Sequence, residues 1–136
     1  MGSRNWPRAR VGTVAAFIGA TGVAVLAVMA WPLASLGAEP EGRAVFERDC
    51  RPCHTVVRLR NHVGPSLFGV VGRTVGSISS FVYSGALRGS VLIWSESFLD
   101  RFLRDPQAVL PGTAMRFPGL SDAGERAALI AYLKGL

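Results

Sequence analysis

Hydrophobic and polar positions divide the chain into an apolar amino-terminal stretch, a few short helical patterns and several long loops. Residues 11–38 carry no charged side chain, whereas charged and apolar residues are mixed from residue 39 onward. Residues 42–49 form a short helical pattern with Val45 and Phe46 on its apolar side. No segment alternates apolar and polar residues over the length of a strand, so the pattern predicts an all-α domain.

Two longer helices are marked by their capping residues. Ser95 is a favourable N-cap for the first of them, and Pro106 ends it. Ser121 or Asp122 caps the last helix of the chain. A short helix is also predicted over residues 84–88. The apolar faces of the two longer helices carry Phe98, Leu99, Phe102 and Leu103, and Leu129, Tyr132, Leu133 and Leu136.

The loops between these helices are unusually long for a small domain. Residues 61–82 and 106–120 contain no convincing helix or strand pattern, and residues 63–76 are rich in glycine. Unstructured stretches beyond about 12–15 residues are uncommon in compact domains. A large apolar group bound in the middle of the domain would explain them, because the loops could wrap around it.

The apolar stretch resembles an export segment. Arg4, Arg8 and Arg10 stand just before it, and they are three of the 15 basic residues in a chain of 136 residues with a net charge of +6. A positive flank followed by an apolar run is typical of exported proteins. The basic balance therefore gives no indication of nucleic-acid binding. We predict an export signal or single membrane anchor over residues 1–38 and one domain over residues 39–136.

The segment fits both a removed signal peptide and a retained anchor. The apolar run over residues 11–31 is longer than the roughly 7–15 residues of a typical signal core. It approaches the roughly 20 residues that span a bilayer. Small residues at positions 34–38, however, suit signal cleavage. Both alternatives place the domain on the periplasmic side, attached to the inner membrane in one case and soluble in the other.

Cys50, Cys53 and His54 form the pattern C-x-x-C-H, which marks covalent attachment of a c-type haem. Two thiols three positions apart can each form a thioether with one porphyrin, and the next residue then points its imidazole at the iron. A thioredoxin-like site requires a βαβ context, which is missing here. Zinc needs four ligands, and His62 would have to be the fourth. The motif therefore predicts one covalently bound haem c with His54 as an iron ligand.

A second iron ligand would come from a methionine or from the other histidine. Met115 is the only methionine after residue 38, and it lies in a proline- and glycine-rich loop over residues 110–119. His62 is the rival, but it follows His54 by only eight residues, so its segment would have to pass around the haem edge at once. We predict Met115 as the ligand and His62 as an exposed loop residue.

The order and spacing of several motifs resemble those of class I cytochromes c of the mitochondrial and alphaproteobacterial kind. The resemblance covers nearly all of residues 39–136 and implies short helices and loops wrapped around one haem. It also implies that the first and last helices cross at Gly42, and that the Pro65 carbonyl accepts a hydrogen bond from His54 Nδ1. The matching motifs are Gly42 and Phe46, Cys50 to His54, residues 63–67, Gly72 and Arg73, Tyr83 and Ser84, Trp94, residues 111–115 and residues 129–133.

The same resemblance implies a set of residues around a haem propionate. Tyr83, Ser84 and Trp94 would donate hydrogen bonds to the propionate, and Arg73 would offset its negative charge. Tyr83 and Trp94 could instead be ordinary core aromatics. A buried indole or phenol needs a hydrogen-bond partner in either case, and an inward carboxylate provides one.

Two departures from the family pattern stand out. Phe102 occupies the place where many relatives have a tyrosine that hydrogen-bonds the methionine sulfur. The lysine ring with which relatives bind their partners is largely absent, since Lys134 is the only lysine of the chain. Gln107 and Ala108 stand where lysines are often found. Four arginines could form a substitute patch or be scattered surface charges: Arg51, Arg88, Arg104 and Arg116.

The leading functional hypothesis is one-electron transfer in a respiratory or photosynthetic chain, rather than enzymatic catalysis. Family analogy suggests a quinol-oxidising cytochrome complex as donor and a terminal oxidase as acceptor. A first alternative is the haem subunit of a dedicated periplasmic dehydrogenase, which has a permanent partner. A second is a haem enzyme or gas sensor with an open iron position, which requires that Met115 does not bind the iron.

Overall fold

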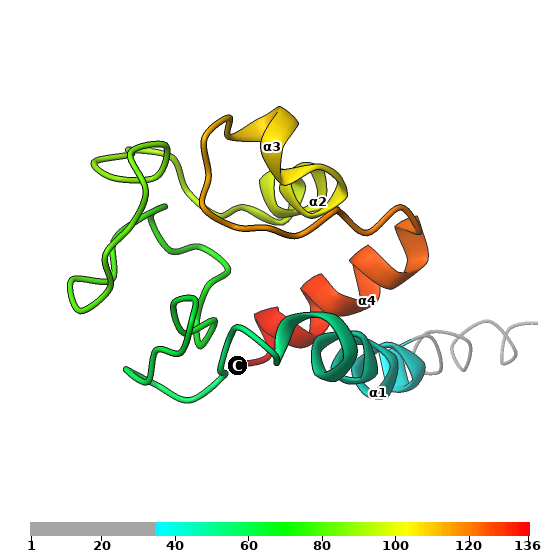
Figure 1. The fold of residues 1–136 in the computed structure, drawn as a ribbon. Coiled ribbons are helices and arrows are strands. Elements are labelled where there is room, and N and C mark those ends of the chain that lie inside the picture. Colours follow the sequence, from blue (N-terminus) through cyan, green and yellow to red (C-terminus); the bar gives the residue numbers. More distant parts are fainter. Residues whose placement is uncertain (1–34) are drawn as a thin grey trace, which may run out of the picture. The chain divides into compact units, whose positions relative to one another are not determined.

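The computed structural model describes the backbone from Ser35 and the side chains from residue 40 to the carboxyl terminus. A long region of loops separates the first helical segments from the later ones, as Figure 1 shows. The predicted all-α class is therefore correct for this part of the chain. The helical elements are α1 (Ser35–Val45), a π-helical turn η1 (Phe46–Cys50), α2 (Glu96–Arg104), α3 (Pro106–Val109) and α4 (Ala123–Lys134).

The first and last helices cross in close contact, as the family resemblance implies (Figure 1). Gly42 lies at the crossing, where a Cβ atom would stand 2.0 Å from the main-chain oxygen of Ala128 and 2.8 Å from Tyr132 Cβ. A missing side chain therefore allows the two backbones to meet. Phe46 packs against Tyr132 with ring centroids 5.8 Å apart, and Leu129 is buried in the same core.

A Gly42→Ala variant should destabilise the protein although alanine favours helix formation. The propensity gain is about 1 kcal/mol. The new methyl group would clash with the α4 backbone, and overpacking costs about 1–3 kcal/mol or more. We expect a lower urea midpoint for the holoprotein. Gly85→Ala is the matched control, because nothing lies within 4 Å of a Cβ there. Equal midpoints for both variants would contradict this account of the crossing.

Side-chain caps define where α2 and α4 begin. Ser95 Oγ accepts a hydrogen bond from Phe98 N at 3.2 Å, and Asp122 Oδ1 accepts one from Glu125 N at 2.8 Å. Both caps agree with the sequence analysis, which left Ser121 open as an alternative to Asp122. These bonds satisfy amide groups that have no partner inside the helix.

The structure differs from the predicted helices at two places. Pro106 ends α2 as expected, but it also begins the short helix α3, which the sequence analysis missed. Proline suits a first helical turn, because its missing amide hydrogen would be unpaired there anyway. The predicted helix over residues 84–88 is wrong. This segment is a single turn, in which Leu87 N and Arg88 N both donate to Ser84 O, at 3.1 and 3.0 Å.

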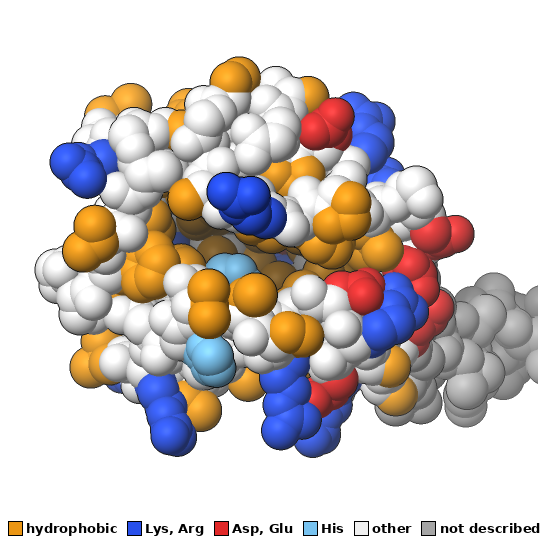
Figure 2. All heavy atoms as spheres, viewed as in Figure 1, with side chains coloured by type: hydrophobic (Ala, Val, Ile, Leu, Met, Phe, Trp, Pro, Cys, Tyr) orange, Lys and Arg blue, Asp and Glu red, His pale blue; other side chains and the backbone are white. Residues whose placement is uncertain are grey.

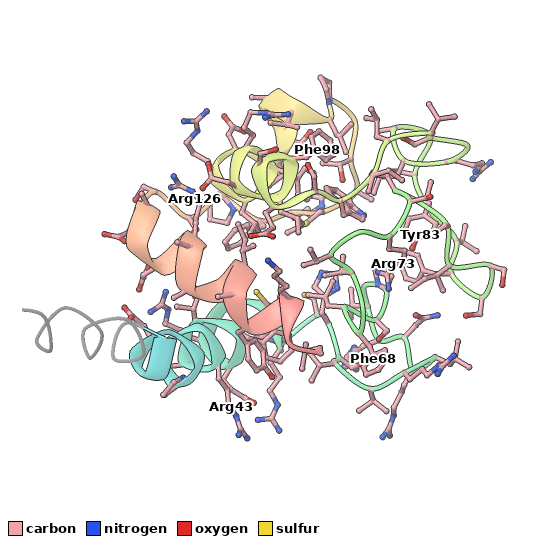
Figure 3. All side chains as sticks on the ribbon, turned by 180° about the vertical axis from the view of Figure 1, so that it is seen from behind. Arg43, Phe68, Arg73, Tyr83, Phe98 and Arg126 are labelled. Carbon is pink, nitrogen blue, oxygen red and sulfur yellow. The ribbon has the colours of Figure 1, made fainter. Side chains whose placement is uncertain are left out.

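Arg126 connects α4 to α2 and to the loop that precedes α4. Its side chain is buried, although arginine is rarely buried without partners. Its Nε donates to Asp100 Oδ1 at 2.7 Å, and its Nη1 donates to the main-chain oxygens of Leu120 and Ser121, both at 2.8 Å. Figure 3 shows Arg126 beside α4 on the side of α2. The guanidinium thus fixes the segment that follows Met115.

The region between η1 and α2 consists of loops and turns. Within the described residues, β pairing is limited to an isolated bridge between Thr74 and Ile93. Figure 1 shows these loops on the left, away from the crossing of α1 and α4. They hold every exposed large hydrophobic residue identified in residues 40–136, namely Val57, Leu59, Val63, Phe68, Val82, Val91, Leu92 and Ile93.

No helix among the described residues is both long enough and apolar enough to cross a membrane. The apolar run over residues 11–31 lies outside the described residues. The expectation of a signal peptide or a membrane anchor there therefore stays a prediction.

Candidate haem site

Cys50 is the last residue of η1, and Cys53 lies in the turn that follows it. Cys53 N and His54 N both donate to Cys50 O, at 3.0 and 2.8 Å. Cys50 is buried and Cys53 is exposed, and both thiols are free. Burial, assisted by the nearby Asp49 carboxylate, raises the pKa of the Cys50 thiol to about 11. One thiol therefore lies in the core and the other at the surface.

The His54 imidazole is held in a defined orientation. Its Nδ1 lies 2.7 Å from the main-chain oxygen of Pro65, which is the contact that the family resemblance implies. Because a carbonyl can only accept, Nδ1 carries the hydrogen and Nε2 keeps its lone pair. Burial lowers the pKa of His54, with the Pro65 hydrogen bond acting in the opposite direction. The neutral ring that a metal requires is thus favoured.

Gly64 allows the main chain to pass directly beside this ring. A Cβ atom at Gly64 would lie 2.4 Å from His54 Cε1 and 2.7 Å from its Nδ1. Any side chain here would displace the imidazole or open the Pro65 contact. Gly64 belongs to the matching motif over residues 63–67, but its close approach to the His54 ring is visible only in the structure.

One face of the domain is hollowed. Figure 2 shows a depression with hydrophobic walls, and one of the two described histidine side chains is visible inside it. Half-buried apolar residues contact the core, among them Leu67, Leu110 and Met115. Within residues 40–136 no cluster of three or more His, Cys, Asp or Glu side chains could hold a bare metal ion. These features fit a large apolar group that brings its own metal ligands, as haem does.

Met115 lies in a loop held by its own hydrogen bonds. Thr113 N donates to Leu110 O at 3.0 Å, and Met115 N donates to Thr113 Oγ1 at 3.4 Å. Gln107 Nε2 donates to Thr113 O at 2.9 Å and approaches Met115 O at 3.5 Å. The side chain at a position often occupied by lysine in relatives therefore supports the Met115 loop here.

Ser84 reaches the same loop from the segment between η1 and α2. Its Oγ accepts a hydrogen bond from Ala114 N at 3.3 Å. Ser84 thus stands beside the proposed methionine ligand, and its hydroxyl hydrogen stays available to an acceptor.

Arg73 and Tyr83 come from neighbouring loop segments, which Figure 3 labels on the side away from α1. The Arg73 guanidinium is half-buried and donates to Phe68 O at 2.8 Å and to Ser66 O at 2.9 Å. Burial lowers the pKa of Arg73. Burial also raises the pKa of Tyr83, while Ile78 and Arg73 act in the opposite direction. The protein thus places a positive charge and a phenol near each other in a partly desolvated region.

Trp94 is buried between loop and helix. Its ring centroid lies 5.2 Å from that of Phe98 and 4.9 Å from that of Phe102. Trp94 N donates to Arg73 O at 2.9 Å. Phe102 is itself buried, and its phenyl ring has no hydroxyl with which to reach a sulfur atom.

Among the described residues, His62 makes hydrogen bonds only to neighbouring residues of its own loop. It is exposed, its Nδ1 accepts a hydrogen bond from Val63 N at 2.7 Å, and its main-chain nitrogen donates to Gly64 O at 2.9 Å. The structure therefore presents His62 as a loop residue, in line with the sequence analysis.

Asn61 was missed by the sequence analysis. It connects two loops through hydrogen bonds to Ser80 and Ser66. A single polar residue in a loop gives no pattern that distinguishes such a role from simple exposure to solvent.

Curated proteins with similar sequences are cytochromes c. The chain is 44% identical over 96 residues to cytochrome c2 of Rhodopila globiformis, a match that covers 71% of this chain and 91% of that protein. It is 46% identical over 87 residues to cytochrome c2 iso-2 of Magnetospirillum fulvum, covering 64% of this chain and 91% of that protein.

A solved cytochrome structure also resembles the fold of this chain. Cytochrome cH from Methylobacterium extorquens has a TM-score of 0.67 and 39% sequence identity, over 72% of this chain and 98% of that one. No protein-family model matches the chain.

Proposed function

The chain belongs to the class I cytochromes c, and from that premise we propose that it carries single electrons between redox proteins of a respiratory or photosynthetic chain. Its cofactor is one covalently bound haem c, and it is an electron carrier rather than an enzyme. When bound, the haem supplies a one-electron couple between ferric and ferrous iron.

Cys50 and Cys53 would hold this haem through thioethers, and His54 and Met115 would bind its iron. The observation that carries the proposal is the hydrogen bond between His54 Nδ1 and Pro65 O, at 2.7 Å. That bond commits Nδ1 and leaves the lone pair of Nε2 available to a metal. His54 and Met115 would together be the protein ligands of the iron, which would leave no position on it for a substrate. Methionine also raises the reduction potential.

Arg73, Tyr83, Ser84 and Trp94 surround a haem propionate in this proposal. The support is chemical: these residues offer a half-buried guanidinium, a phenol whose pKa is raised by burial, a hydroxyl hydrogen and a buried indole. Such donors stabilise an inward carboxylate, which is costly to bury without partners.

The partner surface is formed by the loops rather than by the helices. Residues 50–95 contain five arginines and no Asp or Glu. They also contain the exposed aliphatic residues described above. In Figure 2 the acidic side chains lie over the right and centre of the molecule, and none is visible on the left, where the loops lie. An acidic protein surface with an apolar centre is the partner that this chemistry fits.

Features of the sequence support a periplasmic location. Arg4, Arg8 and Arg10 before an apolar run support export, and covalent haem attachment takes place outside the cytoplasm. We place the domain on the periplasmic side, held at the inner membrane if residues 11–31 are retained. A quinol-oxidising cytochrome complex as donor and a terminal oxidase as acceptor are the partners that the family suggests.

A single purification tests the proposed function. The protein is expressed in a host able to mature c-type cytochromes and analysed by mass spectrometry and by redox titration. We expect a red protein with the mass of one added haem and a reversible one-electron transition. A colourless product with the mass of the bare polypeptide would refute the proposal. The same mass also reports whether residues 1–38 are retained.

One observation favours the second candidate, a haem subunit of a dedicated periplasmic dehydrogenase. Large aliphatic side chains such as Leu59, Val82 and Val91, at 79%, 87% and 89% exposure, are typical of a lasting interface rather than of brief encounters. Affinity purification from the native host at low and high salt separates the two candidates. A free carrier loses its partners as salt rises, whereas a subunit keeps them.

A further inference from the structure

Asn61 lies where two loops meet, and its side-chain amide is hydrogen-bonded at both ends. Its Nδ2 donates to Ser80 O at 3.1 Å and to Ser80 Oγ at 3.2 Å. Its Oδ1 accepts a hydrogen bond from Ser66 N at 3.0 Å. The main-chain amide of Ser66 can only donate, and the Ser80 carbonyl can only accept. The reverse orientation of the Asn61 amide is therefore excluded, because it would place two donors against each other.

The Ser66 amide has a special place next to His54. Its N–H and the Pro65 carbonyl belong to the same peptide group, and that carbonyl is the partner of His54 Nδ1 at 2.7 Å. A continuous series of hydrogen bonds therefore runs from the Ser80 loop through Asn61 and one peptide group to the imidazole. Hydrogen bonds in series polarise one another, so a partner on the N–H side makes the carbonyl a stronger acceptor.

We propose that Asn61 is a positioning residue for the iron ligand, and that it sets the orientation and the basicity of His54 through the Pro65–Ser66 peptide. This inference rests on the proposed function, because it requires His54 to bind the haem iron. A hydrogen bond to the second ring nitrogen makes a ligating histidine more basic. A more basic imidazole stabilises ferric iron and lowers the reduction potential. Asn61 therefore holds the potential below the value that the same ligands would otherwise give.

The other contacts of this segment do not duplicate that role. Ser66 Oγ donates to Val57 O at 2.8 Å, and Arg73 Nη2 donates to Ser66 O at 2.9 Å. These bonds hold Ser66 in place, but they involve neither its N–H nor the Pro65 carbonyl. Within residues 40–136, the Ser66 N–H donates its hydrogen bond to the Asn61 side chain.

Two substitutions of similar size test the proposal on the holoprotein. Asn61→Leu removes the acceptor from the Ser66 N–H, so the reduction potential should rise. The His54 Nδ1 proton should also exchange with solvent faster, by less than the about fivefold that the loss of a whole hydrogen bond gives, because its own bond to Pro65 O is weakened and not removed. Asn61→Asp keeps an acceptor and makes it anionic, so the potential should fall without faster exchange. Nuclear magnetic resonance of the oxidised protein follows the proton, and redox titration gives the potential.

Two matched controls separate this role from general effects. His62→Asp adds the same charge one residue away, on an exposed side chain that does not contact the Ser66 N–H, so it should lower the potential less than Asn61→Asp does. Ser80→Ala removes only the Oγ contact and should leave the potential unchanged. Shifts in the same direction for both Asn61 variants, or equal shifts for the two aspartates, would overturn the inference.

The outcome for the wild-type protein separates this inference from the proposed function. If the oxidised protein shows no His54 Nδ1 proton with a paramagnetic shift, His54 does not bind the iron, and the proposed function itself fails. If the shifted proton is present but neither Asn61 variant changes its exchange or the potential, only the role of Asn61 is refuted.

Discussion

Replacing His54 with alanine is expected to leave no stable holoprotein. The substitution removes the imidazole that Pro65 orients at 2.7 Å and against which Gly64 packs. Thioethers from Cys50 and Cys53 would then hold a haem whose iron has lost its nearest ligand, beside a cavity where the ring stood. Haem staining and mass spectrometry after expression with the maturation system measure the loss, relative to the wild-type yield.

His62→Ala is the matched control for this experiment. His62 is the other histidine after residue 38, is exposed, and should be replaceable without change in haem content or spectrum. A His54→Ala protein that keeps its haem and a low-spin six-coordinate spectrum would show that the wrong histidine has been assigned.

The Met115→Ala variant is expected to keep its haem and lose its second iron ligand. The weak red absorption band that marks thioether sulfur on ferric haem iron should disappear. The reduction potential should fall by tenths of a volt, within the range of about 0.8 V over which axial ligands set haem potentials. Carbon monoxide should also bind rapidly to the reduced protein, because an iron position is open.

Leu110→Ala provides the comparison for Met115→Ala. Both side chains are half-buried in the same loop and pack against the core, but only Met115 carries sulfur. The leucine variant should therefore lose some stability and keep the red band. A wild-type protein without the band, or one that binds carbon monoxide at once, would favour an open-site haem enzyme or sensor over a carrier.

The parts of the fold that were predictable from the sequence are those fixed by local chemistry. Ser95 and Asp122 cap helices because their side chains reach amides three residues ahead. The C-x-x-C-H motif is readable for the same reason, since one helical turn brings its members together. Gly42 was recognisable through the family resemblance, because a helix crossing needs a residue without a side chain.

The parts that were missed depend on contacts between distant segments. The segment over residues 84–88 has the composition of a helix, but its turn packs against Gly76, where a Cβ atom would lie 2.1 Å from Leu87 O. Arg73 was expected only to offset a charge, yet its guanidinium also binds two main-chain carbonyls. Asn61 joins loops 19 residues apart in the sequence. None of these pairings leaves a periodic pattern.

The crossing of α1 and α4 also has a consequence for biogenesis. The contact at Gly42 requires residues 128 and 132, so it cannot form before α4 has been synthesised. Cys50, only 8% exposed once the domain is folded, is hidden by then. Haem attachment to Cys50 is therefore expected before α1 and α4 meet, while the domain is still open.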